Sequence, residues 1–453
     1  MKLKNLNFGN DLLKEILFRN YQSVILIIFL MVLTGVVQAT SVLGVIPIVD
    51  VLLNQDPNQY SEVTKTITNQ FVKYNLPVNI VSLGVFYLLL IGFRSSILYL
   101  QKHVTNRTIF GEMRRMMLEE LKAFLNASWS FFQNKEYGTL ANTVITETHK
   151  ATAGFESLAR TIAIAITVFC YFALLLLISW QLTIIVFLSA AMLLSPTLIV
   201  NRIVYKTGQL HTGAWNVAQG KTYEVLNALK LIAGFAKRED TLKNIEPSVR
   251  TIEKTFRKFA MIRVFLTLLG EPVGVILVII SGVVGMGYYD MQIATLTAFL
   301  YSINRLAGEA QQFILERSAV HASLPSFEQI DSLMQEAALL KEKSTGKKIA
   351  SFSRGIYLTD LSFSYDGGEN ILSNINLEIP KGSMVAVVGH SGSGKSTLID
   401  LIMGFYFSQK GDLRIDKDNI NEINLRDWRM LLGYIPQQPF LFNASIRENL
   451  LWA

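Results

Sequence analysis

The sequence predicts an α-helical membrane domain of six spans followed by an α/β domain. Three observations lead to this prediction. First, 51% of the residues are hydrophobic, a high share for a soluble chain, and they gather in long runs before residue 315. Second, the loops between these runs alternate between short and nearly neutral and long and basic. Third, after residue 351 the pattern changes to short strand-like runs around a glycine-rich loop.

The six apolar runs are each long enough to cross a bilayer, and the loops between them indicate an orientation. The short loops at 179–181 and 288–290 alternate with long, Lys- and Arg-rich stretches. The positive-inside rule places the long stretches and both chain ends in the cytoplasm, which predicts a multi-pass protein of a cytoplasmic (inner) membrane. The expected spans are residues 23–53, 80–100, 158–178, 182–200, 261–287 and 291–315.

Four segments follow from these boundaries. Basic residues and helically spaced leucines and isoleucines predict an interfacial elbow helix at 1–20. The transmembrane domain covers 21–325 and includes an external amphipathic helix within 54–78, where apolar side chains recur every three or four residues. A connecting helix and polar linker take up 326–351, and the α/β domain follows from 352 to 453. Strands are expected in this last domain at 356–365, 371–379, 384–388, 412–415 and 432–435.

The net charge of +7 does not indicate a nucleic-acid partner, because most of the excess Lys and Arg flanks the apolar spans. The single cysteine, Cys170, lies inside a predicted span. It can form no internal disulfide and is interpreted as a packing residue.

A phosphate-binding P-loop follows the apolar run 384–388. Residues 389–397 fit the pattern G-x-x-x-x-G-K-[ST], in which glycines let backbone N–H groups curl around a phosphate. The pattern predicts ATP bound with Mg²⁺: Lys395 would reach the β- and γ-phosphates, and the Ser396 hydroxyl would sit on the metal. The alternative is a Gly/Ser-rich turn without a ligand. The nucleotide-binding residues are Gly389, His390, Ser391, Gly392, Ser393, Gly394, Lys395, Ser396 and Thr397.

Six spans, two long intracellular loops and a C-terminal P-loop domain together resemble an ABC exporter half-transporter, a family that exports lipids, lipid-linked glycans, peptides or drugs. The resemblance implies that Tyr365 stacks on adenine and that Gln437 is the Q-loop glutamine, which contacts Mg²⁺ and the attacking water. An ordinary strand aromatic and a loop amide are the alternatives for these two residues. Residues 130–138 and 224–235 fit the family's coupling elements.

The family's signature segment, catalytic Glu and switch His would follow the Q-loop, and no copy of them occurs up to Ala453. No catalytic residue is therefore assigned, and the second domain is predicted to be an incomplete α/β P-loop nucleotide-binding domain whose apolar strand surface is partly uncovered. We expect a piece of an ordinary exporter that works as a dimer of half-transporters, most simply a homodimer. The alternative is a membrane subunit that binds nucleotide without hydrolysing it.

Arg94 and Arg305 are the candidate substrate residues, because ionisable groups inside spans are costly and usually functional. Each lies about fourteen residues into its span from the outer end, roughly 21 Å deep in a core about 30 Å thick. Paired guanidinium groups suit a phosphate headgroup, which favours an anionic lipid or lipid-linked glycan as substrate. Internal pairing of Arg305 with Glu309 and of Arg94 with Glu271 is the alternative, and a peptide or drug exporter is the rival function.

Overall fold

The computed structural model describes residues 19, 21–53, 60–133, 135, 137–194, 197–289, 291–342, 346–365, 368–437 and 440–452. The backbone divides into two compact units. The first comprises Met1–Leu121 and Glu136–Leu333, and the second comprises Lys122–Lys135 and Met334–Ala453. Two helices, α5 (Ile80–Leu125) and α13 (Ile293–Leu339), run without a break from the first unit into the second.

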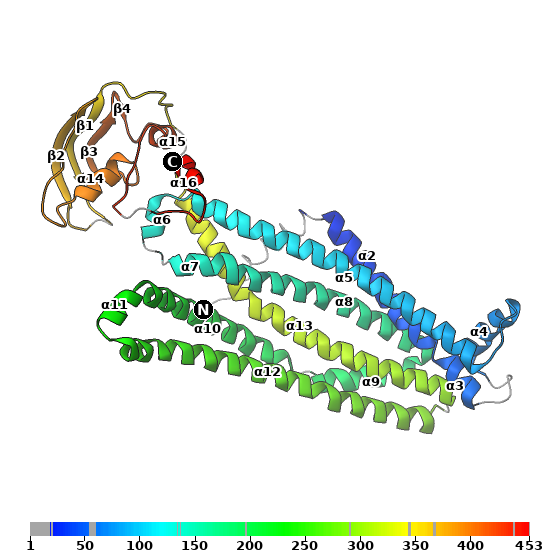
Figure 1. Cartoon of the computed structure of the whole chain (residues 1–453). Helices are drawn as coiled ribbons and strands as arrows, with labels where there is room; N and C mark the ends of the chain where they lie inside the picture. Colours follow the sequence, from blue (N-terminus) through cyan, green and yellow to red (C-terminus); the bar gives the residue numbers. More distant parts are fainter. Residues whose placement is uncertain are drawn as a thin grey trace. The chain divides into compact units, whose positions relative to one another are not determined.

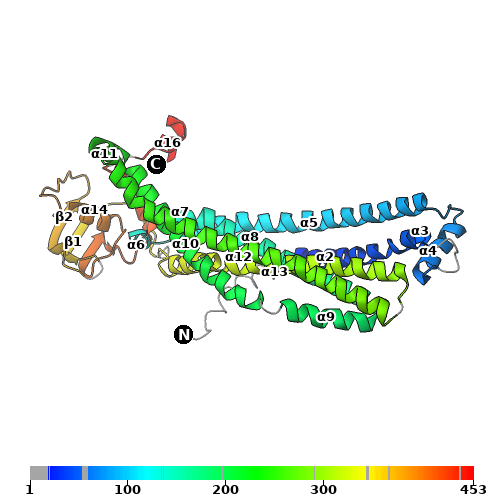
Figure 2. The same ribbon diagram turned by 90° about the horizontal axis from the view of Figure 1, so that it is seen from below.

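The first unit consists of helices and the loops between them where it is described, and its long helices run side by side (Figures 1 and 2). Helix α2 packs along α8, and α12 packs against both α9 and α10. Besides α5 and α13, the elements are α2 (Tyr21–Leu43), α3 (Ile46–Leu53), α4 (Glu62–Lys73), α7 (Tyr137–Asn142), the π-helical turn η3 (Thr143–Glu147), α8 (Thr148–Ile178), α9 (Trp180–Leu194), α10 (Thr197–Asn227), α11 (Leu229–Gly234) and α12 (Arg238–Gly287).

Within the described residues, three helical stretches are long and apolar enough to cross a membrane: Tyr21–Leu53, Ile80–Leu125 and Tyr137–Ile178. They contain the first three predicted spans. Shorter apolar helices cover Trp180–Ala191 and Pro272–Gly287. Large apolar side chains such as Leu88, Phe169 and Leu177 point away from the protein, which water would oppose and a hydrocarbon environment favours.

Helix α4 confirms the amphipathic helix predicted between the first two spans. Ser61 caps its N-terminus, and the carboxylate of buried Asp50 accepts hydrogen bonds from the Ser61 amide at 3.0 Å and the Ser61 hydroxyl at 2.6 Å. Phe71 packs edge-on against Phe86 of α5 at 5.6 Å between ring centroids. The predicted elbow helix lies outside the described residues except for Arg19, which pairs with Glu112 at 3.0 Å.

Both proposed coupling elements overlap short helices. The first overlaps α6 (Trp129–Gln133), which belongs to the second unit. The second contains α11, which has no buried residue and belongs to the first unit.

The nucleotide-binding domain contains a four-stranded antiparallel sheet in the order β2-β1-β3-β4. Leu358 at the centre of β1 pairs with Leu377 on one side and Leu413 on the other. Leu361, Leu401 and Trp428 are among the buried residues of the core beside this sheet. The elements are β1 (Gly355–Phe363), β2 (Leu372–Pro380), α14 (Lys395–Ile402), β3 (Lys410–Ile415), β4 (Asp418–Asn419), α15 (Leu425–Arg429) and α16 (Ile446–Trp452).

Three of the five predicted strands are confirmed, but the strands predicted at 384–388 and 432–435 are wrong: neither segment joins a ladder. Met384 is 97% exposed and Ile435 is 93% exposed. An apolar, β-branched run predicts a strand only if a neighbouring strand accepts its backbone hydrogen bonds. No described segment of this chain does so, and the sheet that forms is antiparallel.

Candidate functional site

The P-loop has a conformation that requires glycine at two of its motif positions. Gly392 has φ +81° and Gly394 has φ +86°, in the left-handed region that side chains with a Cβ rarely adopt. A Cβ on Gly394 would lie 2.7 Å from Leu372 Cδ2 of β2. The backbone thus requires glycine at Gly392 and Gly394, and at Gly394 the packing of β2 against the loop requires it as well.

Lys395 lies over the same loop. Its ammonium group donates hydrogen bonds to the carbonyls of Gly389 at 3.0 Å and His390 at 2.7 Å. Lys395 is also the first residue of α14, whose N-terminus has no side-chain cap. An uncapped helix N-terminus directs free N–H groups and partial positive charge towards a ligand, so the loop, Lys395 and the helix end together suit an anion.

Tyr365 is brought to the end of the P-loop although it lies 32 residues away in the sequence. Its hydroxyl is 3.1 Å from Thr397 Oγ1. Its ring packs edge-on against Phe363 and Tyr406, with centroid distances of 5.0 Å and 5.1 Å. The structure therefore joins two of the predicted nucleotide residues, Tyr365 and Thr397, through a direct contact.

The structure does not bring Gln437 to the P-loop through any described contact. Gln437 is exposed and lies in an irregular segment next to exposed Tyr434 and Ile435. Because residues 432–435 form no ladder, nothing described holds the Gln437 side chain against the loop. Its predicted role in binding Mg²⁺ stays a prediction.

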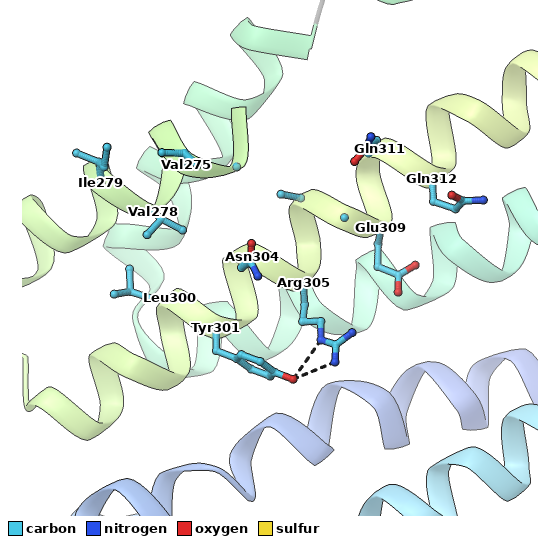
Figure 3. A pocket seen from close by; sticks show the side chains of 13 residues that line it. Val275, Val278, Ile279, Leu300, Tyr301, Asn304, Arg305, Glu309, Gln311 and Gln312 are labelled. Carbon is cyan, nitrogen blue, oxygen red and sulfur yellow. Dashed lines mark hydrogen bonds between the residues drawn. The ribbon is translucent and has the colours of Figure 1, made fainter. Parts of the chain in front are cut away.

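In the first unit, Arg305 pairs with a tyrosine and not with Glu309. Its Nε and Nη2 donate to the Tyr301 hydroxyl at 3.2 Å and 3.0 Å, one helical turn earlier on α13 (Figure 3). Glu309 instead accepts a 2.7 Å hydrogen bond from Gln38 of α2. The alternative Arg305–Glu309 pair is therefore not formed, since both groups have other partners.

Arg305 lines a cavity of about 920 Å³ with one apolar and one polar wall. Val275, Val278 and Ile279 of α12 form much of the apolar wall, and Leu300 of α13 adds to it. The polar wall comes from α13. Its residues are Tyr301, Asn304, Arg305, Glu309, Gln311 and Gln312.

Arg94 lines a second cavity of about 540 Å³ between α2, α5, α8 and α13. Glu309 and Gln312 line both cavities, so α13 is their common wall. Arg94 and Arg305 therefore line two cavities that meet at α13. The side chain of Glu271 lies outside the described residues, and with it the alternative pairing of Arg94.

Several polar residues of these cavities were not predicted from the sequence. Lys102 and Arg160 add cationic groups to the second cavity, and Gln38 adds an amide. The spacing of Tyr301 four residues before Arg305 was a readable signal, because such side chains meet on a helix. Gln38 lies on another helix, and no sequence pattern connects it to Glu309.

Two sequence models match this chain: that of the ABC transporter transmembrane region over residues 16–308, and that of the ABC transporter over residues 372–453. The chain belongs to the ABC transporter family. This membership confirms the resemblance drawn from the six apolar runs and the P-loop, and it identifies the helical unit as an ABC membrane domain.

Curated relatives of this ABC transporter are about one quarter identical to it. The heterocyst differentiation ATP-binding protein HepA of Nostoc sp. is 26% identical over 75% of this chain and 56% of its own length. The ATP-dependent lipid A-core flippase of Desulfotalea psychrophila is 26% identical over 72% and 57%, respectively. The multidrug resistance-like ATP-binding protein MdlB of Buchnera aphidicola is 27% identical over 78% and 61%. The chain thus spans somewhat more than half the length of these relatives.

Proposed function

We propose that this ABC transporter is an ATP-driven exporter or flippase that moves an amphipathic, anionic, lipid-linked substrate across a cytoplasmic membrane as a dimer of half-transporters. One observation carries the substrate class: Arg94 and Arg305 line two cavities that share Glu309 and Gln312 of α13, and the Arg305 cavity has an apolar wall.

The nucleotide half of the proposal depends on the P-loop. ATP would be held by Gly389–Thr397, with Tyr365 at the adenine and Mg²⁺ at Ser396 and Gln437. Lys395 would exchange the carbonyls of Gly389 and His390 for phosphate oxygens, because an ammonium group binds a charged oxygen more strongly than a neutral one. ATP supplies the free energy that favours one conformation of the membrane domain over another. The family's catalytic Glu is not assigned to any residue of this chain.

The substrate half follows from the cavities. Arginine forks grip phosphate oxygens through two parallel hydrogen bonds, and the Val275, Val278 and Ile279 wall offers apolar surface to a hydrocarbon chain. Arg94 has no described carboxylate within ion-pair distance, so its charge is available to an anionic ligand. The relative named as a lipid A-core flippase is in keeping with this substrate class.

The rival function is export of a drug or peptide. The ring of Tyr301, which lines the Arg305 cavity, favours it because phenol rings stack on aromatic ligands. A relative named as multidrug resistance-like supports the same alternative.

A binding experiment separates the two functions without requiring ATP turnover. The full chain in lipid nanodiscs is titrated with a fluorescent polyprenyl pyrophosphate and, separately, with an uncharged fluorescent drug. We expect R94Q/R305Q to weaken pyrophosphate binding by at least tenfold and to leave drug binding within twofold. R250Q, which removes an exposed arginine paired with Glu246 on α12, is the matched control. Equal loss for both ligands, or none, would contradict an anionic substrate.

A further inference from the structure

Glu342 and Arg429 form a two-pronged ion pair within the second unit. Arg429 Nη2 donates to Glu342 Oε1 at 2.7 Å, and Nη1 donates to Oε2 at 3.0 Å. Glu342 lies three residues after the end of α13 at Leu339, and Arg429 is the last residue of α15. The two side chains are only 33% and 25% exposed, respectively, so solvent screens them less than a surface pair. A fork of this kind fixes orientation as well as distance.

The same guanidinium also holds the end of α14. Arg429 Nε donates to the Met403 carbonyl at 3.0 Å, and Nη2 donates to the Gly404 carbonyl at 3.0 Å. The neighbouring Trp428 donates its indole N–H to the Ile402 carbonyl at 2.8 Å. Three successive carbonyls at the C-terminus of α14 are therefore bound, a place where positive charge is favoured. Since α14 begins at Lys395 of the P-loop, Arg429 connects the far end of the P-loop helix to Glu342.

The first coupling element reaches the same point. Trp129 of α6 packs on Phe405 at 5.6 Å between ring centroids, and the Arg429 guanidinium lies 5.0 Å from the centre of the Phe405 ring. The segments that follow α5 and α13 are joined by two backbone hydrogen bonds. The Ser128 amide donates to the Leu340 carbonyl at 2.7 Å, and the Glu342 amide donates to the Asn126 carbonyl at 3.0 Å. Movement of Glu342 would therefore be shared by the ends of both helices that continue into the membrane domain.

We propose that Arg429 is a positioning residue that transmits movement of the P-loop helix α14 to α13 through Glu342. The proposal deepens the proposed function and rests on it, because it requires ATP to bind at the P-loop. Helix α14 has eight residues and is about 12 Å long, short and stiff enough for a shift at Lys395 to reappear at Met403. If Arg429 only capped α14, its hydrogen bonds to the Met403 and Gly404 carbonyls would suffice and its bond to Glu342 would not be needed.

The test compares nucleotide binding with the response of α13. The full chain in nanodiscs is titrated with a fluorescent ATP analogue and Mg²⁺, and hydrogen exchange of the amides of residues 334–342 is followed with and without Mg·ATP. In the unaltered protein we expect Mg·ATP to slow this exchange at least threefold. Glu342→Gln should keep the nucleotide Kd within twofold and lose the exchange response. Arg429→Lys, which keeps the charge but not the fork, should lose at least half of the response.

The matched control is Asp418→Asn. It breaks another ion pair of the second unit, Lys347–Asp418 at 2.6 Å, which touches neither α13 nor α14. This variant should keep both the binding and the response. A response that persists in E342Q would overturn the inference while leaving the proposed function intact. A parallel loss of nucleotide affinity and of the exchange response in E342Q would also overturn it, because that result indicates a general structural role. Nucleotide binding to the unaltered protein without any exchange response would overturn it as well. Failure of the unaltered chain to bind the nucleotide any better than Lys395→Ala would overturn the proposed function itself.

Discussion

Thr148 at the start of α8 donates a 2.6 Å hydrogen bond to Glu120 Oε1 on α5, and both side chains have no exposed surface. The other carboxyl oxygen of Glu120 is buried without a described partner. Glu120 lies forty residues beyond Ile80, roughly 60 Å along the helix, and therefore outside a hydrocarbon core about 30 Å thick. Burial raises the pKa of this carboxyl from 4.5 to about 7, and the Thr148 hydrogen bond opposes that rise more weakly.

The raised pKa predicts that the packing of α5 on α8 is weakened as pH rises. The folded chain holds the Glu120 proton up to about pH 7, whereas the unfolded chain releases it near 4.5, so stability is full below pH 4.5 and falls until about pH 7. The expected loss is about 3 kcal/mol. Thermal unfolding in detergent between pH 4.5 and 8 measures it. Glu120→Gln should flatten this dependence, and an unchanged slope in that variant would assign the titration to another group.

Replacing Gly394 should damage the P-loop. Gly394→Ala places a Cβ 2.7 Å from Leu372 Cδ2 at a residue with φ +86°, which should cost about 1 to 3 kcal/mol of stability and weaken ATP binding at least tenfold. The titration with a fluorescent ATP analogue measures the second effect. Gly433→Ala is the control, because a Cβ there meets no atom within 4 Å. Equal effects of the two changes would contradict the loop geometry.

Helix α4 should depend on Asp50. This carboxylate is 1% exposed and accepts hydrogen bonds from Ser61 and from the Thr64 hydroxyl at 2.5 Å. The Ser61 and Thr64 hydroxyls also bond to each other, so Asp50→Ala leaves the Ser61 amide and one hydroxyl without a partner, which should cost about 2 to 3 kcal/mol locally. Amide exchange of residues 62–73 should rise by at least tenfold. Lys65→Ala, which breaks only an exposed pair with Glu62, should leave it unchanged.

Tyr301 should orient the arginine of the proposed substrate site. Tyr301→Phe keeps the ring beneath the Arg305 guanidinium but removes the hydroxyl that accepts two hydrogen bonds. The ligand must then order the freed guanidinium, so binding of the fluorescent polyprenyl pyrophosphate should weaken about fivefold. Tyr289→Phe, at the loop after α12, is the control. Tighter binding in Tyr301→Phe would mean that the tyrosine competes with the ligand for Arg305.

The structure explains why some predictions from the sequence held and others did not. Local periodicity located α4 and the long helices, because a helix satisfies its own backbone hydrogen bonds and needs only its own residues. The P-loop was equally readable, since Gly392 and Gly394 are required by local backbone angles. The strand at 384–388 could not be judged in this way, because a strand exists only where a second segment pairs with it.

The sequence alone determined that this chain has a helical membrane domain and a P-loop domain, because runs of apolar residues and a glycine-rich motif act over short stretches. Only the tertiary structure decided which distant polar groups meet. It paired Arg305 with Tyr301 and left Glu309 to Gln38, it buried Glu120 against Thr148, and it joined Arg429 to Glu342, 87 residues apart. Such pairings depend on which donors and acceptors the packed helices bring within about 3 Å of each other, and the separation of two residues in the sequence does not predict that distance.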